Sequence, residues 1–416
     1  MSQLSLLTGV FGREAASRVA NVGLPELKGL VDKSFLHRNS AGGFRIHELL
    51  RQFVSAKLKA SPTALKEAET RLREYYASRL QERVPDLQGA GQKAGLDELA
   101  PEFENVLVAW DLAVRDQEFD ALSKMVEGLW LVCELRGWFN EALGAMHRAT
   151  LGMRDATDVS SYLKASLLAC SGRCHLRLHQ LEEAERDLKR ARVEAEPAER
   201  PPLYAFVLNN LGLLELQKSN PIQAQEWFEQ SLKLYSSVDK VWGVANVVNN
   251  LGDALQVQGR AAEAQDHYQR SLRIFRNLTD QRGLVTVLRN LGRLRESQNE
   301  FEEARVCFEE CVSAARDLKD RYMLSRSLRD LALVATKTKE WELAEELLDE
   351  SQTVAETMGD PLEMAHCTFA QARLKQAQGH RDSARGLARE ALRRINRFSD
   401  SPLKPKILGF LDNLNR

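Results

Sequence analysis

The chain has 416 residues, which is too long for one compact core and predicts two or three modules. Its 58 basic and 59 acidic residues nearly cancel, so the net charge of −1 gives no overall attraction to nucleic acid or to an anionic membrane. The apolar runs are too short to span a membrane and the N-terminus lacks a signal-peptide pattern, so we expect a cytoplasmic location and no membrane partner.

Residues 1–60 combine short helices with a hairpin. The predicted elements are helices over residues 13–20 and 25–33, strands over 35–38 and 44–47, and a helix over 48–58. The turn between the strands, Asn39-Ser40-Ala41-Gly42-Gly43, has the residue types of a hairpin. Helices followed by a hairpin suggest a winged helix.

Two segments of this stretch carry a resemblance. They are Leu27–Leu36 (LKGLVDKSFL) and Phe44–Phe53 (FRIHELLRQF), and they resemble the winged-helix module of the STAND class of signalling NTPases. The resemblance places His47 where that family's sensor histidine contacts the diphosphate of bound ADP. That role would need an NTPase domain from a partner chain, and the alternative is a His47 that packs idly at the strand end.

A winged helix can also contact DNA, which would make the protein a transcriptional regulator. The second helix offers Lys28 and Lys33, and the hairpin offers Arg38 and Arg45. DNA readers usually cluster more positive charge and add side chains that read bases. We therefore treat DNA binding as the alternative, and a hinge that transmits ligand binding as the main interpretation.

Residues 61–156 are predicted to form a helical linker. The segments Glu104–Trp110 (ENVLVAW), Leu129-Trp130 and Gly137–Ala142 (GWFNEA) resemble the linker that joins the winged helix to repeats in the same class. Members of that class carry an NTPase domain with a P-loop ahead of the winged helix, and no Gly-x-x-x-x-Gly-Lys-Ser/Thr occurs here. We expect a fragment, a natural truncation or one half of a split system.

From Gly172 onward, small residues recur every 40 residues. The three series are Gly172, Gly212, Gly252, Gly292, Ala332 and Ala372; Ala184, Ala224, Ala264, Ala304, Ala344 and Ala384; and Ala191, Ser231, Ser271, Cys311, Ser351 and Ala391. Small residues at one fixed period predict a stacked array of helical pairs in which two helix backbones pass closely. Such arrays bind partners more often than they catalyse.

Each copy resembles a tetratricopeptide repeat. The small residue in the first helix, the Ala opening the second and the aromatic residue four positions later match its pattern, as in Gly252, Ala264 and Tyr268. The resemblance implies an all-α, right-handed superhelix preceded by the winged-helix module and the linker. We expect about six copies over residues 157–400 and a capping helix over 401–416.

In such an array the first helix of each pair lines a concave groove. Positions two, five, six and nine of a copy share one helix face. The candidate ligand-binding residues at these positions are Asn209, Asn210, Asn246, Asn249, Asn250, Asp253, Arg289, Asn290, Arg293, Arg326 and Arg329. Asparagine is a poor helix former, and its amide has the donor and the acceptor that clasp an extended peptide backbone.

The arginines of this set are suited to carboxylates through forked hydrogen bonds. We therefore expect a protein or peptide ligand with an acidic stretch. The alternative is that these polar residues only solvate the groove or bond between adjacent helices.

No catalytic motif, metal site or cofactor site is predicted. The sequence lacks a nucleophile elbow, a His-Glu-x-x-His and a Rossmann glycine-rich turn. Cys170, Cys174, His175 and His179 resemble a ligand set, but the cysteine and histidine pairs face different sides of one helix. The sequence therefore predicts a non-catalytic sensor or scaffold.

Overall fold

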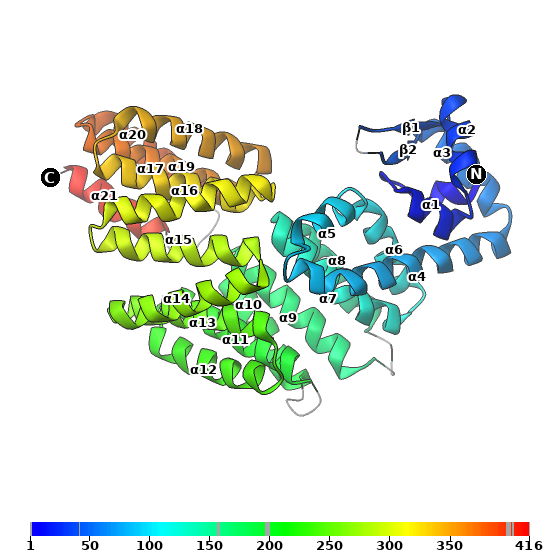
Figure 1. The fold of residues 1–416 in the computed structure, drawn as a ribbon, viewed down its shortest axis with the longest axis horizontal. Helices are drawn as coiled ribbons and strands as arrows, with labels where there is room; N and C mark the ends of the chain where they lie inside the picture. Colours follow the sequence, from blue (N-terminus) through cyan, green and yellow to red (C-terminus); the bar gives the residue numbers. More distant parts are fainter. Residues whose placement is uncertain are drawn as a thin grey trace. The chain divides into compact units, whose positions relative to one another are not determined.

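The structure is a computed structural model that describes residues 2–40, 42–154, 156, 159–195, 200–396, 401 and 403–415. It divides into two compact units. The first comprises Met1–Glu134 and Asn140–Ser171, and the second comprises Leu135–Phe139 and Gly172–Arg416. The expected boundaries at residues 157 and 400 lie outside the described residues. Helices form nearly all of both units, as predicted (Figure 1).

The first unit begins with the predicted short helices and hairpin. Its elements are the 3₁₀ helix η1 (Ser2–Leu6), helices α1 (Arg13–Ala20) and α2 (Leu24–Asp32), strands β1 (Leu36–Arg38) and β2 (Phe44–Ile46), and helix α3 (Glu48–Lys59). The strands pair antiparallel, with Leu36 opposite Ile46. Ala41 of the predicted turn lies outside the described residues, and Gly42 next to it adopts a φ of 85°, which glycine tolerates without strain.

Five helices follow in the predicted linker. They are α4 (Pro62–Leu87), α5 (Gln92–Leu99), α6 (Phe103–Arg115), α7 (Phe119–Arg136) and α8 (Phe139–Gly152). The motif at the start of α6 has a structural role, because the buried Asn105 amide accepts from Gly9 N at 3.2 Å and donates to Val10 O at 2.7 Å. Fully buried Trp110 donates from Nε1 to Ala145 O at 2.9 Å. These bonds tie α6 to the N-terminal strand segment and to α8.

Six helical pairs form the repeat array. The first helices are α9 (Ser161–Arg177), α11 (Pro201–Gln217), α13 (Val241–Val257), α15 (Gln281–Ser297), α17 (Arg321–Lys337) and α19 (Pro361–Ala377). The second helices are α10 (Leu181–Glu194), α12 (Pro221–Ser237), α14 (Ala261–Leu278), α16 (Phe301–Asp317), α18 (Trp341–Met358) and α20 (Arg381–Ile395). Each first helix begins 40 residues after the one before, so the predicted period is confirmed.

The glycine series marks a contact different from the predicted one. A Cβ added to Gly212, Gly252 or Gly292 would lie 2.4–2.6 Å from the ring of the aromatic residue 16 positions later, such as Tyr268 opposite Gly252. An aromatic ring of the second helix, and not its backbone, therefore packs on the glycine. Where the slot holds Ala332, the residue 16 positions later is the smaller Leu348, so the two side chains share one volume.

The third small-residue series joins the two helices of a pair. Ser231 Oγ donates to Ala205 O and Ser271 Oγ donates to Ala245 O, both at 2.7 Å. Ser351 Oγ donates to Ser325 O at 2.8 Å in the same way. A buried hydroxyl needs a partner, and a side chain of this size reaches the facing carbonyl without separating the helices.

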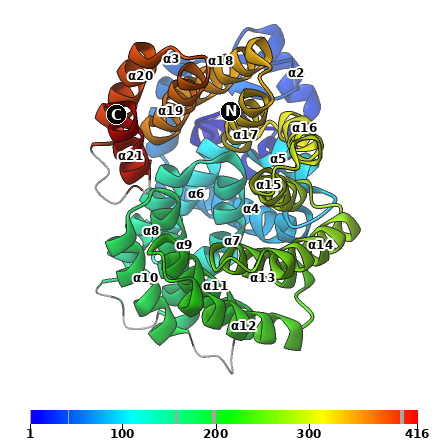
Figure 2. The same cartoon turned by 90° about the vertical axis from the view of Figure 1, so that its left-hand side faces the viewer.

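The first helices form the inner side of the repeat array. Each of α11, α13, α15 and α17 packs against the first helix of the next pair, whereas the second helices make no comparable contact in the described part of the chain. Figure 2 shows α14, α16 and α18 outside α13, α15 and α17. Because successive first helices pack against each other, their side chains can form contacts from one repeat to the next.

The C-terminal helix α21 (Leu403–Asn415) packs against the last pair. Leu403 and Ile407 are buried against α19 and α20, and the rings of Phe410 and Phe369 meet edge to face at 5.3 Å. The apolar end of the array is thereby shielded from water. Within the described ranges, no helix is both long enough and apolar enough to cross a membrane.

Candidate ligand-binding wall

The predicted ligand-binding residues lie on the successive first helices α11, α13, α15 and α17, and we call this row of residues the first-helix wall. Within it, Asn209, Asn210 and Asn249 are buried, with 8%, 0% and 3% of their surface exposed. Asn246, Asn250 and Asn290 are half-buried. The wall therefore has an inner row of covered amides and an outer row of partly accessible ones.

The amides of successive first helices bond to each other. Asn250 Nδ2 donates to Asn209 Oδ1 at 2.8 Å, and Asn290 Nδ2 donates to Asn249 Oδ1 at 3.0 Å. Both pairs join residues 41 positions apart, which are position five of one copy and position six of the next. We call this run of side-chain pairs the inter-repeat ladder. Bonding between adjacent helices, one of the two alternatives raised by the sequence, is therefore one role of these residues.

The next rungs of the ladder are ion pairs. Arg289 Nε and Asp330 Oδ2, again 41 positions apart, lie 2.5 Å from each other as an ion pair without hydrogen-bond geometry. Buried Arg329 donates from Nη1 to Glu363 Oε2 at 2.8 Å. Two of the four predicted carboxylate-binding arginines thus already have carboxylate partners within the chain.

Burial and neighbouring charges shift the pKa values along this part of the ladder. Burial acts to raise the pKa of Glu363, but the charges of Arg329 and Arg326 outweigh it and lower that pKa to about 2. Burial, followed by the charge of Arg326, lowers the pKa of Arg289 to about 10. Burial, with the charge of Arg329, lowers the pKa of His366 to about 3. At neutral pH the two ion pairs are charged and His366 is neutral.

Three further predicted residues have different surroundings. Asp253 accepts a hydrogen bond from Tyr268 Oη at 2.6 Å, and its packed environment raises its pKa to about 6. Arg326 donates to Tyr322 Oη at 2.7 Å and lies half-buried. Arg293 is exposed. Arg293 and Arg326 are therefore the predicted arginines that remain for an acidic ligand.

The repeat pattern did not lead us to predict two further cations, Arg373 and Lys406. Burial and the charges of Arg293 and Arg373 lower the pKa of Lys406 on α21, which shows that the three groups share one neighbourhood. Arg373 stands 80 residues after Arg293, at the same repeat position. Extending position nine to the sixth copy would have found Arg373, whereas Lys406 lies outside the period.

A short segment of the chain covers part of the wall in the second unit. The ring of Phe139 meets Tyr322 edge to face at 5.6 Å, and Arg136 Nη1 donates to Leu318 O at 3.1 Å. The Arg177 guanidinium lies 5.9 Å from the centre of the Phe139 ring. Leu135–Phe139, which we call the corner segment, thus occupies the start of α17.

The N-terminal candidates lie at the surface of the first unit. His47 is exposed at the start of α3, so it is not packed at the strand end. The cations considered for DNA contact are also exposed: Lys28, Lys33, Arg38 and Arg45. Glu26, Asp32 and Glu48 lie close to them in the sequence, so positive charge is not concentrated on one element.

The residues that resembled a metal set have other contacts. His175 Nδ1 lies 2.6 Å from Gln180 Oε1, and its Nε2 lies 3.3 Å from Asp187 Oδ2. Burial lowers the pKa of His179. In the described part of the chain, no three His, Cys, Asp or Glu side chains are placed to hold a metal ion.

The helical pairs match a known repeat. Residues 163–237 and 243–317 match the family model described as tetratricopeptide repeat. The remaining pairs continue with the same period and the same helix bounds. The helical pairs are tetratricopeptide repeats. No curated protein matches the sequence.

Solved structures share the fold at low sequence identity. A Signal Transduction ATPase with Numerous Domains (STAND) protein with a tetratricopeptide repeat sensor, from Pyrococcus horikoshii, is 16% identical with a TM-score of 0.57. The match covers 100% of this chain and 58% of that one, so the chain spans little more than half the length of the STAND protein.

Two peptide-related structures are also similar. A Rap protein complexed with Competence and Sporulation Factor is 13% identical with a TM-score of 0.56, over 82% of this chain and 98% of that one. NprR in complex with its cognate peptide NprX is 12% identical with a TM-score of 0.50, over 72% and 83%. At these identities the likeness shows a tetratricopeptide-repeat superhelix.

Proposed function

We propose that the protein is a non-catalytic sensor or scaffold that binds a peptide or protein segment along the first-helix wall and relays this event to a regulatory partner. The observation that carries the proposal is the row of half-buried amides at Asn246, Asn250 and Asn290. Each is held in place by a hydrogen bond, to Trp242 O, Asn209 and Asn249 respectively. Amides fixed before binding lose little entropy when they clasp a peptide backbone.

The similar solved structures support a peptide as the ligand. The Rap protein and NprR are both described as complexes, NprR with its cognate peptide. A tetratricopeptide superhelix of this size can therefore hold a short chain. The buried row, Asn209, Asn210 and Asn249, would position the outer row and not contact the ligand.

The charges near α15, α19 and α21 favour an acidic stretch in that ligand. Arg293, Arg373 and Lys406 come from three elements, and the charges of the two arginines help to lower the pKa of Lys406. A carboxylate among them would relieve this mutual repulsion. Arg289 and Arg329 would contribute less, since Asp330 and Glu363 already neutralise them.

The relay would start at the corner segment. Its Phe139 covers Tyr322 next to Arg326, so a ligand that extends along α17 competes with it. The corner segment contains the end of α7 and the start of α8. A displacement of the segment would therefore move these two linker helices. The receiving partner in this proposal is an NTPase domain in trans, with exposed His47 as the group that would meet its nucleotide.

The binding proposal is tested by selecting ligands from a random displayed-peptide library on the full chain. The affinity of a selected peptide is then measured for the wild type and for the Asn246→Ala/Asn290→Ala variant. We expect a loss of about tenfold, since two polar contacts of roughly 0.5–1.5 kcal/mol each are removed. Gln269→Ala, exposed on the outer helix α14, is the matched control. Equal affinity for wild type and variant, with an intact fold, would place the ligand elsewhere.

The relay is tested with the fluorescence of Trp138 in the corner segment. The difference between wild type and Trp138→Phe isolates its signal, which should change when the selected peptide binds. An unchanged signal at saturating peptide would contradict the relay while leaving peptide binding in place.

DNA binding remains the alternative because the four cations of the N-terminal module are exposed. It predicts salt-dependent binding of the full chain to duplex DNA that Lys28→Glu/Arg45→Glu weakens. No binding at low salt removes this alternative.

A further inference from the structure

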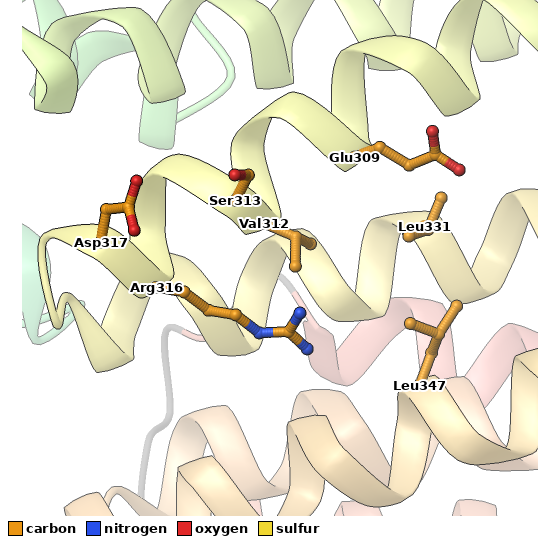
Figure 3. Close-up of a pocket in the computed structure, with 7 residues that line it drawn as sticks. All are labelled: Glu309, Val312, Ser313, Arg316, Asp317, Leu331 and Leu347. Carbon is orange, nitrogen blue, oxygen red and sulfur yellow. The ribbon is translucent and has the colours of Figure 1, made fainter.

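A cavity lies between α16, α17 and α18 of the repeat array. None of the candidate ligand-binding residues of the first-helix wall lines it. Its volume is about 380 Å³, and its floor is formed by Val312 of α16, Leu331 of α17 and Leu347 of α18. In Figure 3 these three side chains point toward the same space. We call this site the outer cavity. Its volume lies near the lower end of the roughly 300–1,000 Å³ range of ligand pockets.

The rim of the outer cavity is acidic. Glu309 and Asp317 of α16 are exposed at its edge, and Ser313 lies between them. Figure 3 shows the one basic side chain of the lining, Arg316. Its Nη2 contacts both carboxylate oxygens of Glu350 on α18, at 2.7 and 2.8 Å. That arginine is neutralised, so the negative charge of the rim is left without compensation.

The two helices that border the cavity are acidic along their whole length. Helix α18 carries six carboxylates and no basic residue, and α16 carries five carboxylates and two arginines. Both arginines contact carboxylates, Arg305 at Glu340 and Arg316 at Glu350.

The neighbouring outer helices have the opposite balance. Helix α14 has three arginines and two carboxylates, and α20 has five arginines and two carboxylates. The negative surplus is −3 on α16 and −6 on α18, whereas it is only −1 on each of the second helices α10 and α12. A uniformly solvated outer face would not show this contrast, so the charge points to a positively charged occupant.

We propose that the outer cavity docks a basic segment of a partner protein that inserts one aliphatic side chain between flanking lysines or arginines. The apolar floor supplies the burial that anchors the aliphatic group. The rim and the two helices supply the field that orients the cations on either side. This site is formed by α16 and α18 together with Leu331 of α17 and uses none of the candidate ligand-binding residues, so it goes beyond the proposed peptide sensing.

The proposal is tested by fluorescence anisotropy with the full chain and three labelled peptides. The first peptide alternates lysine and arginine around one central leucine, the second has glutamine in place of that leucine, and the third replaces every basic residue by glutamate. We expect saturable binding of the first, about tenfold weaker binding of the second, and none of the third, since burial of one leucine corresponds to about a factor of ten.

Charge reversal then locates the site. Glu309→Lys/Asp317→Lys should weaken binding of the leucine peptide by about tenfold. The control Glu226→Lys/Glu229→Lys makes the same change in net charge on α12, and Glu229 has the repeat position of Glu309 two copies earlier. That control should change the affinity by less than about twofold. All four positions are exposed, and far-UV circular dichroism with a thermal melt checks that the variants fold.

Several results would overturn the proposal. Failure of the wild type to bind the leucine peptide removes it, and so does equal binding of the leucine and glutamine peptides, which would show charge attraction without insertion. An equal loss in the α12 control removes the location. Sedimentation velocity tests whether a second copy of this chain occupies the outer cavity instead. Self-association of the wild type that Glu309→Lys/Asp317→Lys abolishes would assign the cavity to that second copy and overturn the proposal.

Discussion

The two halves of the inter-repeat ladder join successive first helices with different chemistry. From α11 to α15 the rungs are neutral amide pairs, Asn209 with Asn250 and Asn249 with Asn290. From α15 to α19 they are ion pairs, Arg289 with Asp330 and Arg329 with Glu363. Three of the four rungs join residues 41 positions apart, whereas Glu363 follows Arg329 by 34. The residue types of a rung decide how much stability is lost when one partner is removed. An amide can turn to water when it loses its partner, but a buried ion cannot.

The halves also differ where the two helices of a pair cross. In the amide half the slot is glycine facing an aromatic ring, as in Gly252 with Tyr268. In the charged half, Gly292 of α15 still faces the ring of Phe308, but the slot in α17 is Ala332 facing the smaller Leu348. The four predictions below test these differences, from the largest expected effect to the smallest.

Removing one partner of a charged rung should have the largest effect. Glu363→Gln leaves Arg329 buried and unpaired, so we expect the free energy of unfolding to fall by about 3–5 kcal/mol. The measurement is urea unfolding followed by circular dichroism. The control Arg329→Leu/Glu363→Leu removes both charges and should lie within about 1 kcal/mol of the wild type. A double variant as unstable as the single one would contradict this account.

Removing one partner of an amide rung should cost less. Asn249→Ala deletes an amide that donates to Asn250 at 3.3 Å and accepts from Asn290 at 3.0 Å, but both neighbours are half-buried and can bond to water. We expect a loss of about 1–2 kcal/mol in the same unfolding measurement. A loss as large as that of Glu363→Gln would erase the distinction between the two halves.

Adding a methyl group at the glycine that faces the aromatic ring should lower the free energy of unfolding. Gly252→Ala brings a Cβ to 2.5 Å from the Tyr268 ring, and Tyr268 is held by its bond to Asp253. The overpacking cost of about 2 kcal/mol exceeds the gain in helix propensity of about 1 kcal/mol, so the net loss should be about 1 kcal/mol. Adding Tyr268→Leu reproduces the pairing of Ala332 with Leu348. The two changes together should therefore cost less than the sum of their separate effects.

The pH dependence should have opposite signs in the two halves. His366 has a pKa of about 3, below its unfolded value of 6.5, so its contribution to stability is present above pH 6.5 and is lost as pH falls from 6.5 towards 3. Asp253 has a pKa of about 6, above its unfolded value of 3.8, so its contribution is present below pH 3.8 and is lost as pH rises through 6.

The measurement is the unfolding free energy between pH 5 and pH 7 for wild type, His366→Gln and Asp253→Asn. Relative to wild type, His366→Gln should lessen the loss of stability on acidification, and Asp253→Asn should increase it. Two variants that shift the slope in the same direction would contradict the assignments.

Much of the fold followed from the sequence, because the 40-residue period and the apolar spacing are local signals. The helices predicted at residues 13–20 and 48–58 and the hairpin all appear close to their predicted bounds. The contact at the glycines differs from the predicted close approach of two helix backbones. The spacing of small residues shows where little volume is available, but it does not show which group occupies that volume. Phe228, Tyr268 and Phe308 fill it with their rings.

The sequence predicted where the candidate residues lie on the first helices, but it did not predict which side chains they bond to. The asparagines and arginines do line successive first helices, and their role in ligand binding stays a proposal. That Asn209 meets Asn250 depends on the offset of 41 residues, which arises from the curvature of the array and not from the period itself. Arg289 and Asp330 share this offset, so complementary residues at 41 positions were a readable signal. The placement of Phe139 at Tyr322 had no such signal, because it joins segments without periodicity.

The constant spacing of the first helices has a consequence for shortened forms of the chain. Excision of residues 241–280 would join α12 to α15 through a turn like the one it replaces, because α13 and α15 begin 40 residues apart. Asn290 would then take the place of Asn250 opposite Asn209, and amide would still meet amide. Excision of residues 281–320 would set Asn249 against Asp330, a neutral group facing a lone carboxylate. We therefore expect the chain to fold after excision of residues 241–280, within the amide half. We expect it to be destabilised by excision of residues 281–320, where amide rungs give way to ion pairs.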